Sequence, residues 1–388
     1  MAVQGPPITI NELIQLTNVG VPLDQVTWSR VTLTSDKWIA VRHGNKEDNK
    51  RSMALGTKDV TDAGIPVTVL SPKDGSISYA GQTTADFVLM NPSEPVIALK
   101  AGLRLEVFNV ETKSMIAKTR MDDPLVYWTW VSSDYIAMVT DHAVYHWNPW
   151  LKTGHYSQPE KMFVRHPRLA FSEIVAYKAN LSLKWLAVTG LTPEDDKISG
   201  VTQLYNTDED VTQCIASHAV CFAPYRFHDN ATKSTILCVA TRDVQNHGKV
   251  HVIELGPYIP GNFAPRNSYD HIQYLDDKDH YDFPMAVHVS ADLGLLFVLT
   301  KYGYLYLCDM ETASCLCFTR VSMDVIFTST INSLTQGILG VTRGGQVITV
   351  DIKKEGLIDY VRDTAKKSNQ ADRLERTIAI PVPASNTH

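Results

Sequence analysis

The hydrophobic pattern between Leu295 and Val321 predicts a β-meander. An apolar run ends at Thr300, the chain turns at Gly303, and a second apolar run occupies 304–307. A polar turn then leads to a third run at 315–318. Short aromatic and aliphatic runs separated by Gly or polar turns are typical of antiparallel strands. The segment therefore predicts three neighbouring strands.

The same pattern occurs seven times along the chain. The copies align on the residue that ends each first strand: Arg42, Lys100, Thr140, Thr189, Thr241, Thr300 and Thr342. The spacings are 58, 40, 49, 52, 59 and 42 residues. Repeats of roughly 40–50 residues, each a small antiparallel sheet, indicate a β-propeller. A β-sandwich also has regularly spaced short strands, but seven copies of one pattern favour an all-β, seven-bladed propeller.

The two ends of the repeat region predict how the ring closes. Residues 7–16, PITINELIQL, carry alternating apolar residues and predict a strand that pairs into the last blade. After Asp351 the apolar residues change to helical spacing. We therefore expect a propeller over 1–351 and the start of an α-helical segment over 352–388, whose short helices have little to pack against.

Two stretches predict long irregular segments. Residues 44–84 are rich in Gly, Lys, Asp and Ser between short strands and predict long outer loops in the first blade. In residues 257–282, Pro and Asp interrupt regular structure.

Composition excludes several classes of function. The chain has 44% hydrophobic residues, 20% charged residues and a net charge of −6, which argues against nucleic acid as the main partner. No apolar run reaches the roughly 18 residues of a membrane span, and the N-terminus lacks a secretory signal pattern. The six cysteines lie in or beside apolar strands without a C-x-x-C pair. They predict buried thiols in a reducing compartment rather than disulfides or zinc ligands.

Candidate chemical motifs are better explained as structure. Ser290-Ala-Asp292-Leu-Gly294 resembles the start of the Asp box of sialidase propellers, but it occurs once and lacks the following Thr-Trp, which favours a turn. Residues 206–210 lack the Gly and the bidentate Glu of a calcium loop. His142 and His146 flank a short strand, where a hydrogen-bonded structural role is expected. Because hydrolase, P-loop and dinucleotide motifs are absent, we expect a non-enzymatic protein without a metal or cofactor.

The strand over 103–110 carries the most informative pattern. Its two faces alternate, with Leu103, Leu105 and Val107 on one and Arg104, Glu106 and Phe108 on the other. The first face is core. The second combines a charge pair with an aromatic ring, and Lys113 follows in the next turn. That face fits an extended peptide, and equally a contact between blades with a solvated rim.

Several segments resemble the N-terminal propeller of the clathrin heavy chain family. They are SDKWIAVR (35–42), MNPSEPVIALKAGLRLEVFNVETKS (90–114), TDHAVYHW (140–147), KWLAVTG (184–190), LTKYGYLYLCDMETAS (299–314) and GGQVITV (344–350). They follow the family's order over nearly the whole chain. The resemblance identifies a divergent member cut after its first domain, with the region after 352 matching the start of the helical leg.

The resemblance implies a docking hub without enzymatic activity or cofactor. It would lie on the cytoplasmic face of coated pits and vesicles and bind short peptides of adaptor and accessory proteins in endocytosis. Other clathrin heavy and light chains would bind through regions absent from this chain. The alternative is a generic interaction propeller, such as a tryptophan–aspartate-repeat protein, which predicts Trp-Asp strand endings that the chain lacks.

The resemblance also implies three peptide sites. The main one, between blades one and two, takes leucine-rich acidic clathrin-box peptides and maps to Ile97, Arg104, Glu106, Phe108 and Lys113. This chain departs from the family at Glu106 (Gln in the family), Arg104 (Thr), Gly81 (Arg) and Met115 (Lys). The departures imply an altered preference at the peptide's acidic end.

The resemblance implies two further sites, the first a looser match and the second with five residues of matching type. A top-surface site for tryptophan-containing peptides maps to Trp28, Glu173 and Val175. A site between blades four and five for a second leucine-rich motif maps to Trp185, Leu204, Val211, Gln213 and Ile215. There, Glu209 replaces a family Arg, and Arg266 is the expected cation from the 257–282 stretch. Buried packing between blades is the competing interpretation of the apolar members.

Overall fold

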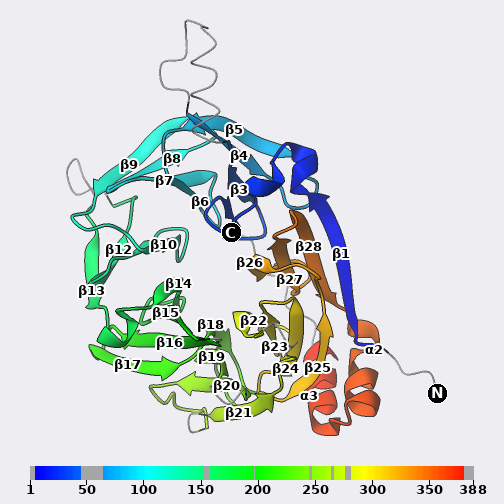
Figure 1. Ribbon diagram of the computed structural model, residues 1–388. Coiled ribbons are helices and arrows are strands. Elements are labelled where there is room, and N and C mark those ends of the chain that lie inside the picture. The colour runs from blue at the N-terminus through cyan, green and yellow to red at the C-terminus, as the bar shows by residue number, and fades with distance from the viewer. Residues whose placement is uncertain are drawn as a thin grey trace, which may run out of the picture.

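Seven four-stranded antiparallel sheets form a closed ring (Figure 1). The computed structural model describes residues 5–44, 64–151, 158–195, 197–243, 247–263, 266–275 and 281–379. Within these residues each sheet is one blade, and its strands follow one another from the centre of the ring outward. The predicted seven-bladed propeller is confirmed.

The first six blades follow chain order. Blade one contains β2 (Val31–Thr32), β3 (Ile39–Arg42), β4 (Ile65–Leu70) and β5 (Ile77–Thr83). Blade two contains β6 (Phe87–Met90), β7 (Val96–Ala101), β8 (Arg104–Asn109) and β9 (Ser114–Arg120). Blade three contains β10 (Tyr127–Trp130), β11 (Ile136–Val139), β12 (Ala143–Trp147) and β13 (Glu160–Val164).

Blades four to six repeat this arrangement. Blade four contains β14 (Glu173–Ala179), β15 (Trp185–Glu194), β16 (Lys197–Asn206) and β17 (Val211–Ala216). Blade five contains β18 (Ala219–Tyr225), β19 (Ser234–Arg242), β20 (Gly248–Leu255) and β21 (Asn267–Ile272). Blade six contains β22 (Pro284–Ser290), β23 (Leu295–Thr300), β24 (Tyr304–Asp309) and β25 (Cys315–Arg320). Short 3-10 turns η1 (Leu16–Val19), η2 (Leu23–Gln25) and η3 (Pro167–Leu169) complete the connections.

Blade seven closes the ring with both ends of the repeat region. It contains β26 (Ile326–Ile331), β27 (Ile338–Thr342), β28 (Gln346–Ile352) and, on the outside, β1 (Ile8–Gln15). The register sets Ile8 opposite Ile352 and Gln15 opposite Gln346. The predicted closure by the N-terminal strand is confirmed, and Figure 1 shows β1 beside β28.

Alternation along the second strands lets each blade bury both faces. All six residues of β23 are buried. Leu296 and Val298 pack in a cluster with blade five, whereas Leu295, Phe297 and Leu299 pack with blade seven. A strand with apolar neighbours on both faces is apolar throughout, which explains the continuous apolar runs of the repeats.

A recurring turn joins the third and fourth strands of several blades. It begins at an Asx residue whose side-chain oxygen accepts hydrogen bonds of 2.8–3.1 Å from the backbone N–H groups two and three residues later: Asn109, Asn206 and Asp309. Four residues after each, the backbone has positive φ, at Lys113 (53°), Asp210 (52°) and Ala313 (60°). Asx side chains stabilise such turns locally. The turns therefore fix where the outer hairpins end.

The two stretches expected to be irregular are only partly so. Residues 257–282 contain β21, the outer strand of blade five, so that expectation is wrong there. Its sequence, NSYDHI, is polar because an outermost strand is largely exposed, and it is hydrogen-bonded along β20. In the 44–84 stretch, β4 and β5 occupy the end, and residues 45–63 lie outside the described residues.

The C-terminal segment is helical, as predicted, but it packs closely against the ring. It contains α2 (Lys354–Asp359), the π-helix η4 (Tyr360–Thr364) and α3 (Ser368–Ala379). Leu357, Val361, Ala371 and Leu374 are each 0% exposed and join the apolar cluster of blades six and seven. Figure 1 shows the helices against the outer side of β25.

The expectation that these helices have little to pack against is therefore wrong. Arg373 explains part of the difference, because its Nε lies 2.6 Å from Oδ1 of Asp309, and neither side chain is more than 6% exposed. Its Nη2 also donates to the carbonyl of Gly294 at 2.9 Å. The division into domains at 351/352 stays a prediction.

Candidate functional sites

The strand register places four of the five residues expected at the main site on one face of blade two. Ile97 lies opposite Phe108, Glu106 opposite Leu99, and Arg104 opposite Ala101, so these side chains share a face. That face packs on blade one, in a cluster that includes Val67 and Val69 of β4. Ile97 is 2% exposed and Phe108 is half-buried. Phe108 is therefore the more accessible member of this pair, and Ile97, beside it on β7, is covered by the cluster with blade one.

The charged residues of this face form a cation-rich edge. Arg104 Nη2 pairs with Glu106 Oε1 at 2.9 Å, with side chains 63% and 30% exposed. The β8–β9 register adds two cations that sequence reasoning missed, Arg120 opposite Arg104 and Lys118 opposite Glu106. Lys113, the fifth expected residue, is exposed in the Asx turn at the end of the hairpin.

Tyr79 is a further residue that sequence reasoning did not find. A Cβ added at Gly81 would overlap the Tyr79 hydroxyl oxygen, so the Tyr79 ring covers Gly81. Tyr79 packs against the blade one–two cluster together with Phe108 and Leu99. The absence of a side chain at 81 thus lets an aromatic ring occupy the surface beside Phe108. Neither the contact between Tyr79 and Gly81 nor the position of the Tyr79 ring follows from strand periodicity.

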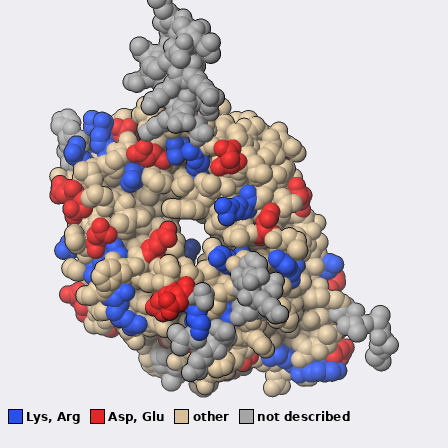
Figure 2. Space-filling model, in the orientation of Figure 1, with Lys and Arg blue, Asp and Glu red and all other residues tan. Residues whose placement is uncertain are grey.

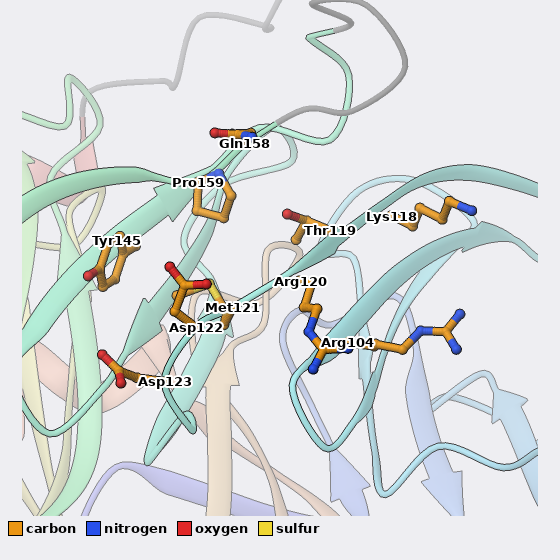
Figure 3. Close-up of a pocket in the computed structure, with 10 residues that line it drawn as sticks. All are labelled: Arg104, Lys118, Thr119, Arg120, Met121, Asp122, Asp123, Tyr145, Gln158 and Pro159. Atoms are coloured by element: carbon orange, nitrogen blue, oxygen red, sulfur yellow. The ribbon is translucent and has the colours of Figure 1, made fainter.

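A cavity of about 610 Å³ lies at the C-terminal end of β9, between blades two and three. Residues 118–123 of blade two and Tyr145 of blade three contribute to its lining. In Figure 3, Asp122, Asp123 and Tyr145 gather on one side, and Arg104 and Lys118 lie on the other. The cavity thus has an acidic and a basic end.

The top-surface residues meet only in part. Trp28 is 66% exposed and Val175 is 37% exposed, and both line a cavity of about 530 Å³ at the centre of the ring. A register shift between Ile174 and Ala176 marks a bulge at Val175, which takes that residue out of the regular ladder. Glu173 is exposed at the start of β14 but does not line the cavity.

The five residues expected between blades four and five also share one face. Trp185 lies opposite Asn206, which lies opposite Val211, and Leu204 lies opposite Gln213. Ile215 is two residues beyond Gln213 on the same face. Leu204 is 6% exposed and packs with Val220 and Leu237 of blade five, whereas Val211 is 54% exposed. Leu204 is therefore core, and the accessible part of the face is its outer edge.

Arg266 does not lie where the cation of that site was expected. Its Nη2 pairs with Asp229 Oδ2 at 2.8 Å, and its guanidinium lies 4.8 Å from the Phe227 ring centroid. Its Nη1 lies 3.9 Å from Glu311 of blade six. The expectation is wrong because Arg266, which directly precedes β21, contacts Phe227 of blade five and Glu311 of blade six, at the boundary between those two blades.

The remaining polar candidates have structural roles. His146 is 4% exposed, and its Nε2 lies 2.7 Å from the hydroxyl of Tyr177. Burial lowers the pKa of His146 to about 4, so it is neutral at pH 7. The six cysteines are free thiols, and four of them are buried. In the part of the chain that the structure describes, no group of three or more His, Cys, Asp or Glu is arranged to hold a metal.

Nothing in the described helices resembles a membrane span, since none is both long and apolar enough to cross a bilayer. The described helices are those of the C-terminal segment and the short 3-10 turns.

Comparison with known proteins relates the chain to one family. No protein-family model matches it. It is 35% identical over 373 residues to a clathrin heavy chain of Drosophila melanogaster, and 33% identical over 369 residues to clathrin heavy chain 2 of Homo sapiens. It is also 33% identical over 375 residues to a probable clathrin heavy chain 1 of Caenorhabditis elegans. These alignments cover 95–97% of this chain and 21% of each relative.

Solved structures support the fold alone. A chain in the crystal structure of a mitotic checkpoint complex superposes with a TM-score of 0.54 at 10% identity, covering 91% of this chain and 96% of that one. The chain spans about a fifth of the length of the clathrin heavy chains it matches. With identity of 33–35% over nearly all its residues and a closed seven-bladed ring, the chain belongs to the clathrin heavy chain family, as a β-propeller region.

Proposed function

We propose that this propeller is a non-enzymatic docking module of clathrin coats that binds short peptides of adaptor and accessory proteins. Such a role places it on the cytoplasmic face of coated pits and vesicles during endocytosis and vesicle transport. Coat assembly with other heavy and light chains would use the rest of a longer protein. Family membership supports the coat role, and the face of blade two supports the peptide role.

The observation that carries the proposal is a partly exposed aromatic surface beside a cation-rich edge. Phe108 lies beside buried Ile97, and Tyr79 extends the apolar surface onto blade one. A leucine side chain that loses its water there would contribute roughly 1.5–3 kcal/mol. Arg104, Arg120, Lys118 and Lys113 supply positive charge for acidic residues of the same peptide. A leucine-rich acidic peptide fits both features.

The two parts of this surface should contribute unequally. We expect Phe108→Ala to weaken a leucine-rich acidic peptide by about tenfold or more, because it removes the apolar contact. Lys113→Ala should weaken it by less than about fivefold, because both charges stay solvated, and that effect should shrink as salt screens it. Fluorescence-anisotropy titrations at low and high salt measure both.

A matched control is Phe171→Ala, because Phe171 is 94% exposed and lies outside the three predicted sites. Its affinity for the peptide should equal that of the wild type. A Phe108→Ala variant with unchanged affinity, or a Lys113→Ala variant that loses more, would exclude this face as the peptide site. If peptide binding then followed Val211 or Gln213, the face between blades four and five would be the main site.

A further inference from the structure

Two cysteines face each other across the outer hairpin of blade six. In the β24–β25 ladder, Cys308 lies opposite Cys315. The backbone N–H of Asp309 donates to the carbonyl of Ser314 at 2.9 Å. The cysteines are therefore the next, non-hydrogen-bonded pair of this ladder, whose Cα atoms lie about 4.5 Å apart. Because a disulfide requires a Cα separation of roughly 4.4–6.8 Å, the ladder sets the two cysteines at a spacing that a disulfide can bridge.

The side chains of this pair lie on the same face of the blade. Cys308 belongs to the apolar cluster that blade six shares with blade five, and Cys315 packs against that cluster. The two thiols interact directly, since a hydrogen bond between them shifts the pKa of each. Cys317 belongs instead to the cluster with blade seven. Of the two cysteines of β25, only Cys315 thus shares a face with Cys308.

The two thiols differ in access and in charge. Cys308 is 0% exposed, whereas Cys315 is partly exposed. The hydrogen bond from Cys308 lowers the pKa of Cys315, and so does the ammonium of Lys367, although burial and Asp270 oppose them. The same hydrogen bond, together with burial, raises the pKa of Cys308. Because the thiolate is the reactive form of cysteine, Cys315 is the nucleophile of the pair.

The C-terminal segment holds Lys367 beside this pair. The Nζ of Lys367 lies 3.1 Å from the hydroxyl oxygen of Ser314, the residue before Cys315. The turn between the two cysteines also contacts α3, through the pair of Asp309 and Arg373. Figure 2 shows Lys and Arg side chains at the lower right of the view, where Figure 1 has these helices. The helices thus bring positive charge to a cysteine of the ring.

We propose that Cys308 and Cys315 form an oxidation site, at which a peroxide converts the two thiols into a reversible disulfide, with Cys315 attacking first beside Lys367. The Cys315 sulfur attacks one peroxide oxygen and the O–O bond breaks, which leaves a sulfenic acid. The departing hydroxide takes the thiol proton and becomes water. The Cys308 sulfur then attacks the sulfenic sulfur, so the S–S bond forms and the S–O bond breaks. This second hydroxide takes the proton of Cys308.

The reaction balances as two thiols and one hydrogen peroxide giving one disulfide and two waters. A dithiol reductant reverses it by thiol–disulfide exchange. The disulfide closes a covalent loop around the turn that contacts Lys367 and Arg373. Oxidation would therefore fix the part of blade six on which the C-terminal helices dock.

Blade five contains a second cross-strand pair of cysteines, which provides an internal comparison. Cys221 lies opposite Cys238 in the β18–β19 ladder. Cys221 is 9% exposed and Cys238 is 0% exposed, so both thiols are buried. Strand register alone predicts a disulfide at both pairs. Access of the peroxide to a thiolate predicts one at Cys308 and Cys315 only.

The test is treatment of the whole chain with hydrogen peroxide at pH 7, then alkylation of the remaining thiols and mass spectrometry without reduction. Digestion at Glu311 separates the two cysteines of the pair. We expect a crosslink between Cys308 and Cys315 that dithiothreitol removes, and none between Cys221 and Cys238. Cys214→Ser is the control, since Cys214 is a partly exposed thiol opposite Gln203, and its crosslink yield should equal that of the wild type.

Single variants separate the roles of the two thiols. In Cys308→Ser, peroxide should leave a sulfenic acid at Cys315 that dimedone traps, whereas in Cys315→Ser dimedone should not label Cys308. Lys367→Gln should slow crosslinking about threefold or more, because it removes the cation beside the nucleophile. Lys366→Gln makes the same change at an exposed neighbour and should react at the wild-type rate.

Four outcomes would each overturn the proposal. The first is the absence of a crosslink between Cys308 and Cys315 in the wild type. The second is a crosslink between Cys221 and Cys238 that forms equally fast. The third is dimedone labelling of Cys308 in Cys315→Ser, and the fourth is an equal crosslinking rate in the two lysine variants.

Discussion

Arg373→Ala should lower the free energy of unfolding by about 3–5 kcal/mol, the range seen when one partner of a buried ion pair is removed. The variant leaves the carboxylate of Asp309, which is 0% exposed, without its 2.6 Å contact to Nε. It also removes the donor to the carbonyl of Gly294. Urea unfolding measures the change. Because Arg373 lies on α3 and Asp309 at the end of β24, the loss measures how much the contact between the helices and the ring contributes to the free energy of unfolding.

Two variants make this test specific. Arg376→Ala removes an exposed arginine of the same helix and should change the free energy of unfolding by about 0.5 kcal/mol or less. Adding Asp309→Asn to Arg373→Ala should recover part of the loss, since the amide oxygen still accepts from the turn while the buried charge is gone. Equal effects of Arg373→Ala and Arg376→Ala would mean that the helices contribute little to the stability of the propeller.

Acid should destabilise the protein through His146. Its pKa is lowered from 6.5 to about 4, so below pH 6.5 the unfolded chain takes up a proton that the native protein does not. The free energy of unfolding should therefore fall as pH decreases from 6.5 to 4, by about 3 kcal/mol from this residue. His146 causes no loss of stability above pH 6.5, and the loss that it causes increases as the pH falls from 6.5 to 4. Urea unfolding at pH 7 and pH 4 gives the difference.

Because other groups titrate in the same window, the comparison is between variants. His146→Gln should show a smaller fall between pH 7 and pH 4 than the wild type, whatever its stability at pH 7. His142→Gln is the control, because it replaces an exposed histidine near His146. Its free energy of unfolding should fall between pH 7 and pH 4 as much as that of the wild type. A His146→Gln variant with the wild-type pH dependence would show that His146 is not protonated on unfolding in this range.

Local periodicity was sufficient to predict the ring. Each blade needs a strand that is apolar on both faces, as β23 is, and this requirement leaves a run that repeats visibly in the sequence. The closure of the ring was predictable for the same reason, since Ile8, Ile10 and the following residues keep the strand alternation. β21 was missed because an exposed outer strand needs no apolar run.

The docking of the helices depends on a contact that no local pattern shows. Arg373 and Asp309 are 64 residues apart, and an arginine on a charged helix has the same local appearance whether it is solvated or buried. Local patterns also do not show the cation-rich edge, because Arg104 and Arg120 become a cross-strand pair only through the register of the β8–β9 hairpin.

For the candidate sites, periodicity predicted faces but not exposure. Ile97 and Phe108 share a face, as do Leu204 and Gln213. Whether a residue of that face is covered depends on the neighbouring blade, which is remote in the sequence. Ile97 and Leu204 proved buried, and Phe108 proved accessible in part. Tyr79 acquired its place through the missing side chain of Gly81, a packing effect that only the assembled fold reveals.

The docking of the helices on blades six and seven has a consequence for avidity. A leg continuing from α3 would hold the ring from that side, while the faces between blades one and two and between four and five belong to other parts of the circle (Figure 1). If both faces bind peptides, as predicted, one flexible ligand carrying two motifs could then occupy both faces of one ring. Its second motif would bind at an effective concentration set by its linker, highest when the linker length matches the span between the faces. Weak single contacts would thus suffice for firm yet reversible attachment.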